Sequence, residues 1–180
     1  MNVRRIVTGQ GADGRSFLAS DETVGPITVA MMPGAAFHEI WGADQVPTVP
    51  TDGSYPPAYG WFPPAGGFRF GFATLPPDGA EDAAADAPLD MDIATAEVYE
   101  KLPGLLDVFE ADEPGMHTTD SIDYLYVVSG TVALELGDGT LVTLKQGDTV
   151  IQNGTRHRWH NTGTEPVVFA LALVGAVSSS

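Results

Sequence analysis

The feature that most constrains this sequence is a series of short β-prone runs between residues 114 and 177, each closed by a turn signal. Gly130, the Gly-Asp-Gly run 137–139, Gly147-Asp148, Asn153-Gly154 and Thr162-Gly163 separate the runs. Strands this short, at this spacing, are typical of an antiparallel barrel or sandwich. The expected strands cover 123–129, 131–136, 141–144, 149–152, 157–161 and 167–174.

The preceding segment, residues 1–79, differs because nine of the fourteen prolines lie between Pro33 and Gly79. Proline removes a backbone donor and fixes φ, so this part cannot hold a long helix. It is nevertheless rich in aromatic side chains, which is unusual for a disordered linker. We therefore expect an extended β and Pro/Gly-rich N-terminal arm, with short strands at 27–32 and 68–73, that packs on its own barrel or on a partner subunit. The aromatic residues in question are Tyr55, Tyr59, Trp61, Phe62 and Phe68.

Residues 80–113 are acidic, with twelve of the 24 carboxylates between Asp78 and Glu113 and a single base, Lys101. Such a charge run favours a solvated face over a cation-binding surface. Asp90 or Asp92 can cap a helix that Pro103-Gly104 would end. We expect one short helix here, with an apolar stripe of Met91, Ala94, Val98 and Leu102.

Composition excludes several classes of partner. The chain has 180 residues, which fits a single domain, and a net charge of −16, so it lacks the basic face that nucleic acid or anionic lipid would require. Its longest apolar run, residues 167–177, is too short to span a bilayer. The absence of cysteine excludes disulfides and thiolate metal sites. We expect a cytoplasmic protein without a signal peptide, membrane or nucleic-acid partner.

Two of the four histidines stand in a recognisable frame. His117 is followed by Thr119, then by Asp123 and, after six intervening residues, by Gly130. Farther along, Gly147 is followed by Gly154, His157 and Asn161. His38 and His160 lie outside this frame, and we expect both to be structural.

These two stretches resemble the two motifs of the cupin superfamily. In the first cupin motif, His117 matches the first histidine, Asp123 the acid and Gly130 the glycine, while Thr119 stands in place of the second histidine. The second motif is matched by the glycines, His157 and Asn161, but its turn is one residue shorter and lacks proline. The resemblance implies an all-β fold, a cupin-type antiparallel β-barrel or jelly roll over 114–177, with motif residues facing a metal inside it.

A barrel interior that holds His117, Asp123 and His157 offers two imidazoles and one carboxylate, which suits Fe, Mn, Ni or Zn. Residues two apart in a strand share a face, so Leu125, Val127 and Trp159 would make the surrounding substrate pocket apolar. Thr119 would line the same pocket and bond a bound water. The open alternative is that the metal has been lost and His117 and Asp123 form a satisfied buried polar pair.

The sequence therefore favours a metal-dependent cupin enzyme acting on a small apolar, aromatic or polyketide-like molecule. Dioxygenase, isomerase, decarboxylase and cyclase chemistry remain open, because fold does not select among them. The alternative is a non-catalytic cupin that binds a small molecule without metal. The aromatic arm and the family resemblance also predict a symmetric homodimer.

Overall fold

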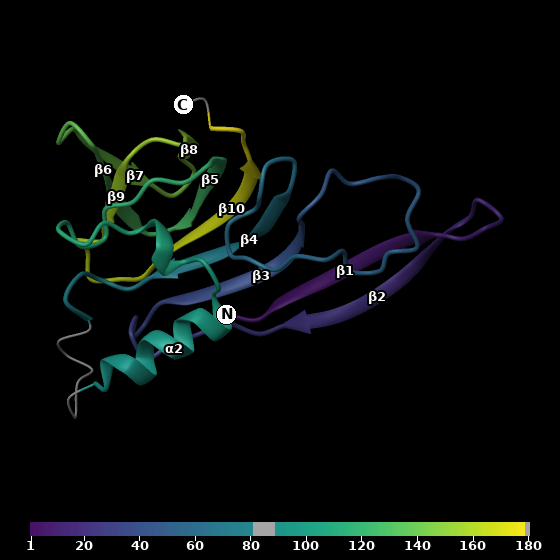
Figure 1. Ribbon diagram of the computed structural model, residues 1–180, viewed down its shortest axis with the longest axis horizontal. Helices are drawn as coiled ribbons and strands as arrows, with labels where there is room; N and C mark the ends of the chain where they lie inside the picture. The colour runs from purple at the N-terminus through teal and green to yellow at the C-terminus, as the bar shows by residue number, and fades with distance from the viewer. Residues whose placement is uncertain (81–88, 179–180) are drawn as a thin grey trace.

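The computed structural model describes residues 1–80 and 89–178 and shows two antiparallel sheets that face each other across a core (Figure 1). The five-stranded sheet has the order β3-β4-β10-β5-β8, and the three-stranded sheet has the order β7-β6-β9. Their strands are β3 (Ala36–Ala43), β4 (Phe68–Leu75), β5 (Ser121–Ser129), β6 (Thr131–Leu136), β7 (Leu141–Lys145), β8 (Thr149–Asn153), β9 (His157–His160) and β10 (Val167–Gly175). The all-β prediction is confirmed.

The six strands from β5 to β10 follow the expected runs to within two residues. The turn between β5 and β6 depends on Gly130, whose φ of 88° lies in the left-handed region that favours glycine. A Cβ at this position would also meet the Cα atom of Val167 at 3.0 Å. The glycine of the first motif is therefore explained by the β5–β6 turn.

The strand β10 joins the two halves of the chain. It pairs with β5 on one side and with β4 on the other, so β3 and β4 from the Pro-rich segment complete the main sheet. The expected strand at 68–73 is confirmed as β4. The expected strand at 27–32 is wrong: Ile27 makes one isolated bridge to Phe37, and the chain then turns, with the Met32 amide donating to the Val29 carbonyl.

A separate hairpin of β1 (Val3–Gln10) and β2 (Ser16–Val24) extends away from the two sheets (Figure 1). The Arg5 side chain links β1 to β3 by donating to the Ile40 carbonyl and by stacking over the Trp41 and Tyr55 rings. The sequence did not predict this hairpin, because charged and polar residues occupy both of its faces.

The aromatic residues of the Pro-rich segment pack in part on their own chain. Trp61 is buried against Phe37, with ring centroids 5.2 Å apart, whereas Tyr59 is exposed. Arg69 on β4 anchors the same segment, because its buried guanidinium pairs with Asp44 and donates to the Gly60 carbonyl.

The helix α2 (Met91–Lys101) lies where the apolar stripe predicted one, with Asp90 as its N-cap. The Asp90 carboxylate accepts from two backbone amides of the first turn. Val98 and Leu102 are buried against the inner side of the five-stranded sheet, whereas Met91 is exposed. Part of the expected acidic segment, 81–88, lies outside the described residues. No helix among the described residues is long and apolar enough to cross a membrane.

We expect Leu102→Ala to lower the free energy of unfolding by about 2–5 kcal/mol, because it leaves a cavity in the core beneath α2. The matched control is Ile93→Ala on the exposed side of the same helix, which should change stability by less than about 0.5 kcal/mol. Urea unfolding of both variants measures the difference. Equal effects would contradict this packing.

The outer side of the five-stranded sheet is apolar. Phe70, Ala172, Tyr124 and Ile151 form one cross-strand row over β4, β10, β5 and β8. The three large side chains of this row are 40–50% exposed, as is Val174 beside them. None of these side chains carries a charge, although the chain as a whole has a net charge of −16.

The homodimer stays a prediction, and we expect a second copy to cover this outer side, because pairing there buries exposed apolar side chains and places no charged side chain of this row in contact with the partner. Light scattering should then give twice the chain mass of 18.9 kDa. Tyr124→Lys should shift the protein to monomer, whereas Leu141→Lys, an exposed apolar position on the other sheet, should not. A wild-type monomer at micromolar concentration would contradict the prediction.

Candidate functional site

The structure brings His117 and His157 together through their backbones. The amide of each residue donates to the carbonyl of the other, at 2.9 and 3.0 Å. Residues that exchange both hydrogen bonds in an antiparallel pair lie directly opposite each other, with their side chains on the same side. The two imidazole rings accordingly lie 4.2 Å apart between centroids.

Both imidazoles are oriented by a backbone carbonyl two residues earlier. Nδ1 of His117 lies 3.0 Å from the Gly115 carbonyl, and Nδ1 of His157 lies 2.8 Å from the Thr155 carbonyl. A carbonyl only accepts, so each Nδ1 carries the proton and each Nε2 presents a lone pair. This is the tautomer in which histidine binds a metal or accepts a proton through Nε2.

Burial keeps this pair of rings neutral. It lowers the pKa of His117, and it lowers the pKa of His157 to about 4, with the neighbouring His117 adding to the effect on His157. His157 is also almost fully buried, at 3% exposure. Two neutral imidazoles are therefore present at neutral pH, and within the described part of the chain no group bonds their Nε2 atoms.

Asp123 lies in a different hydrogen-bonded group. Its Oδ1 accepts from the Ser121 hydroxyl at 2.6 Å, and Ser121 also lies 3.0 Å from the Thr119 hydroxyl. All three residues are buried, and burial raises the pKa of the Asp123 carboxyl above its ordinary value. Asp123 therefore keeps a proton to higher pH than an exposed aspartate does.

Among the residues that the structure describes, no three His, Asp or Glu side chains come close enough to hold a metal ion together. The geometry thus unites two of the three predicted ligands, His117 and His157, and leaves Asp123 bonded to Ser121. Sequence reasoning missed Ser121 and Gln152 in this interior. Strand alternation from Asp123 and from Val150 was the signal that could have found them.

The predicted pocket residues are divided among different places. Leu125 and Val127 lie in or against the hydrophobic core between the sheets, beside Val150 and Leu134. Thr119 lines a hollow of about 320 Å³ at the ends of β5 and β8, together with Asn153 and Gly154. Trp159 lines a larger groove on the β9 side.

This larger hollow, the Trp159 groove, has a volume of about 510 Å³. Neither imidazole of the pair is part of its lining, but two lining residues contact them: the Trp159 ring lies edge-on to His157 at 5.7 Å, and the Gly115 carbonyl orients His117. On its polar side, Arg158 and His160 both bond Glu135. Its apolar lining includes Met31, Met32, Ala35, Phe37, Leu75 and Pro76.

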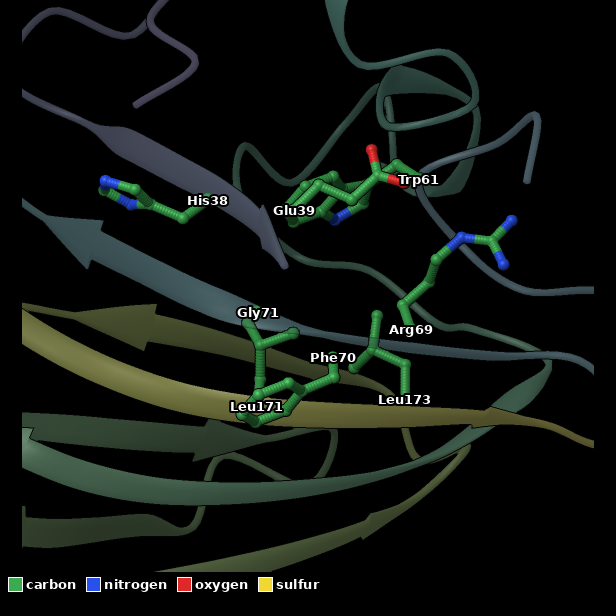
Figure 2. Close-up of a pocket in the computed structure, with 8 residues that line it drawn as sticks. All are labelled: His38, Glu39, Trp61, Arg69, Phe70, Gly71, Leu171 and Leu173. Atoms are coloured by element: carbon green, nitrogen blue, oxygen red, sulfur yellow. The ribbon is translucent and has the colours of Figure 1, made fainter. Parts of the chain in front are cut away.

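A second, much smaller cavity lies between β3, β4 and β10 (Figure 2). Its volume of about 10 Å³ is about that of a single water, so it cannot hold a substrate. His38, which is fully buried here, turns its ring away from Glu39 and Trp61 and places Nε2 2.7 Å from the Met1 carbonyl (Figure 2). His38 thus holds the N-terminal residues against β3.

Comparison with known proteins identifies the part of the chain that carries the histidine pair. Residues 108–174 match the model of the cupin domain, Cupin_2, which spans β5 to β10 and both histidine motifs. This segment, residues 108–174, is therefore assigned to the cupin domain family.

Several known proteins are similar to this chain over the same region. Phomopsin biosynthesis cluster protein C' of Diaporthe leptostromiformis is 43% identical over 65 residues, which are 33% of this chain and 34% of the relative. The cupin-domain-containing oxidoreductase virC of Hypocrea virens is 39% identical over 54 residues, 28% of each chain. The matched region thus spans about a third of these relatives. The Cnp3 cupin domain of Schizosaccharomyces pombe aligns with 96% of this chain and 87% of its own, at 12% identity and a TM-score of 0.45.

The pKa of His157 makes stability depend on pH. Between pH 6.5 and about 4 the unfolded chain binds a proton at this histidine that the folded protein does not, so stability falls as pH falls through this window. We expect a loss of roughly 2–3 kcal/mol from this residue. Urea unfolding at pH 7 and pH 4.5, in the presence of a chelator, should show the loss in wild type and a smaller one in His157→Gln. The same pH dependence in both proteins would contradict this.

Proposed function

We propose that this cupin is a metal-dependent enzyme that acts on a small, apolar organic molecule, with His117 and His157 as the metal ligands. The observation that carries the proposal is the orientation of the two rings. Both Nδ1 atoms lie against carbonyls, and the two Nε2 atoms, on neighbouring and neutral imidazoles, have no hydrogen-bond partner among the described residues.

The donor set fits a divalent transition metal with two imidazole ligands. Imidazole suits Zn, Cu, Fe and Ni, and the carbonyl bonds to Nδ1 are the outer contacts that such ligands ordinarily have. Because the described residues do not add a third histidine or carboxylate to the pair, the remaining coordination positions would be left to water and substrate oxygen atoms.

When bound, the metal would supply a Lewis acid that polarises a substrate carbonyl or enolate oxygen, or a place for O₂ beside the substrate. The protein's own residues supply the rest. The buried Asp123, bonded to Ser121, can hold or accept a proton, because its raised pKa brings its protonated form within reach.

The Trp159 groove supports an apolar substrate. Its volume of about 510 Å³ falls within the range of small-molecule sites, roughly 300–1,000 Å³. Methionine, proline and aromatic side chains line it, and residues that border both imidazoles lie on its wall. An aromatic or polyketide-like body would fill the groove and direct an oxygen toward the histidine pair.

The names of the relatives are consistent with this substrate class. One of them is named a phomopsin biosynthesis cluster protein, and the other is named a cupin-domain-containing oxidoreductase. We extend to this chain only the general role, the conversion of a small biosynthetic molecule. Dioxygenase, isomerase, decarboxylase and cyclase reactions are all compatible with such a site.

The second candidate function is a non-catalytic cupin that binds a small molecule without a metal. The separation of Asp123 from the histidine pair favours it, because a complete three-residue ligand set is not assembled among the described residues. In that case the two neutral imidazoles would accept hydrogen bonds from the ligand.

Metal binding by histidine variants separates the two functions. Metal-free protein loaded with Fe(II), Mn(II), Ni(II) or Zn(II) in turn should retain about one ion per chain for at least one of them. We expect His157→Ala to weaken that affinity at least tenfold, since one imidazole ligand is lost. Elemental analysis after gel filtration measures the occupancy.

The matched control is His160→Ala, three residues along the same strand, which bonds Glu135 and should retain full occupancy. Asp123→Asn should also retain it, because the carboxylate is assigned to proton transfer. Full occupancy in His157→Ala would remove this histidine from the site. A wild type that binds none of the four metals would favour the metal-free candidate.

A further inference from the structure

The geometry points to Gln152 as a substrate-recognition residue, whose side-chain amide donates a hydrogen bond to an oxygen atom of the small molecule bound beside His157. This inference rests on the proposed function only in requiring that a small molecule binds at the histidine pair. The inference adds to the proposed function one residue that recognises a functional group of that molecule.

Gln152 lies inside the barrel. It is the buried residue of β8, with 4% exposure, and shares its side of the strand with Val150, which packs against the core between the sheets. In the β5–β8 register it lies directly opposite Asp123. Opposite residues of an antiparallel pair point to the same side, so both side chains face the interior.

The amide of Gln152 has one end fixed and the other end free. The Thr155 hydroxyl donates to Oε1 at 2.9 Å, which directs the NH₂ group away from Thr155. Nε2 is buried and has no hydrogen-bond partner among the described residues. A buried donor without an acceptor destabilises a folded protein, so its presence here is best explained by a ligand that supplies the acceptor.

Thr155 also connects this donor to the histidine pair. Its hydroxyl holds Gln152, while its carbonyl orients the ring of His157 through Nδ1. One residue therefore sets the direction of both the free amide and the free Nε2 atom. A ligand held at His157 would accept from the NH₂ group of Gln152, which comes from β8 in the opposite sheet.

The chemistry of the donor defines the ligand group. An amide NH₂ only donates, so it selects a hydrogen-bond acceptor. The next pair on the same side of β5 and β8, Leu125 and Val150, is apolar, which favours an oxygen on an apolar body. The class is a small molecule with a carbonyl or enolate oxygen. An analogue that lacks this oxygen would leave the amide unpaired and bind less well.

Tropolone, an apolar ring with adjacent carbonyl and enol oxygens, is a suitable probe for zinc-loaded protein. We expect Gln152→Met to weaken tropolone binding about tenfold, because one hydrogen bond to the ligand is lost, and to leave zinc affinity unchanged. Asn153→Met, which removes an amide from the exposed next position of the same strand, should change neither value.

Two further measurements separate recognition from a merely structural role. The side-chain NH₂ resonances of Gln152, assigned by their loss in Gln152→Met, should shift when tropolone is added. The melting temperature of ligand-free Gln152→Met should equal or exceed that of wild type, because an unpaired buried donor has been removed.

A Gln152→Met variant that binds zinc and tropolone as wild type does would overturn the inference while leaving the proposed function intact. Wild-type protein that binds zinc but not tropolone would overturn it as well. Failure to bind zinc would instead count against the proposed metal site, and the tropolone and resonance measurements on metal-free protein would still decide the role of Gln152.

Discussion

The backbone bridge between His117 and His157 is the interaction on which the candidate site depends. His117 precedes β5 of the five-stranded sheet, and His157 begins β9 of the three-stranded sheet, so two hydrogen bonds tie the sheets together at this end of the barrel. Because a pair of this type places both side chains on the same side, the bridge also brings the imidazoles together. The same two hydrogen bonds therefore join the sheets and bring the two imidazoles of the candidate site together.

Polar and apolar surfaces are distributed in an unusual way around the five-stranded sheet. Its inner side carries Asp123 and Gln152 in addition to a hydrophobic core, whereas its outer side exposes Tyr124 and Phe70. Buried polar groups with incomplete partners and exposed apolar rows both reduce stability. A ligand inside the barrel would supply partners for the buried polar groups. A second chain on the outer side would cover the exposed apolar row.

The sequence predicted the barrel well because its strands are local and each ends at a glycine, aspartate or asparagine turn. The runs from residue 123 onward matched β5 to β10, and Asp90 with the stripe through Val98 and Leu102 matched α2. The β1–β2 hairpin was not predicted, because its many polar residues do not alternate with apolar ones. The 27–32 run was apolar enough for a strand, but beyond Ile27 it turns instead of pairing.

The candidate site was harder to predict than the fold. Motif spacing identified His117 and His157, whose proximity depends on a bridge between two sheets that local patterns do not encode. It could not show that Ser121 would hold Asp123, or that Thr155 would orient both His157 and Gln152. Thr155 lies in the turn between β8 and β9, where side-chain direction follows from backbone geometry and not from periodicity. Ser121 and Asp123 instead share one side of β5, which strand alternation could have indicated.

The central claim is that the two free Nε2 atoms hold one metal ion, and anomalous X-ray diffraction from crystals of zinc-loaded protein tests it most directly. The predicted result is a single anomalous peak about 2.1 Å from Nε2 of both His117 and His157. A peak bound by other residues, or crystals with no peak at this pair after loading with zinc, would contradict it.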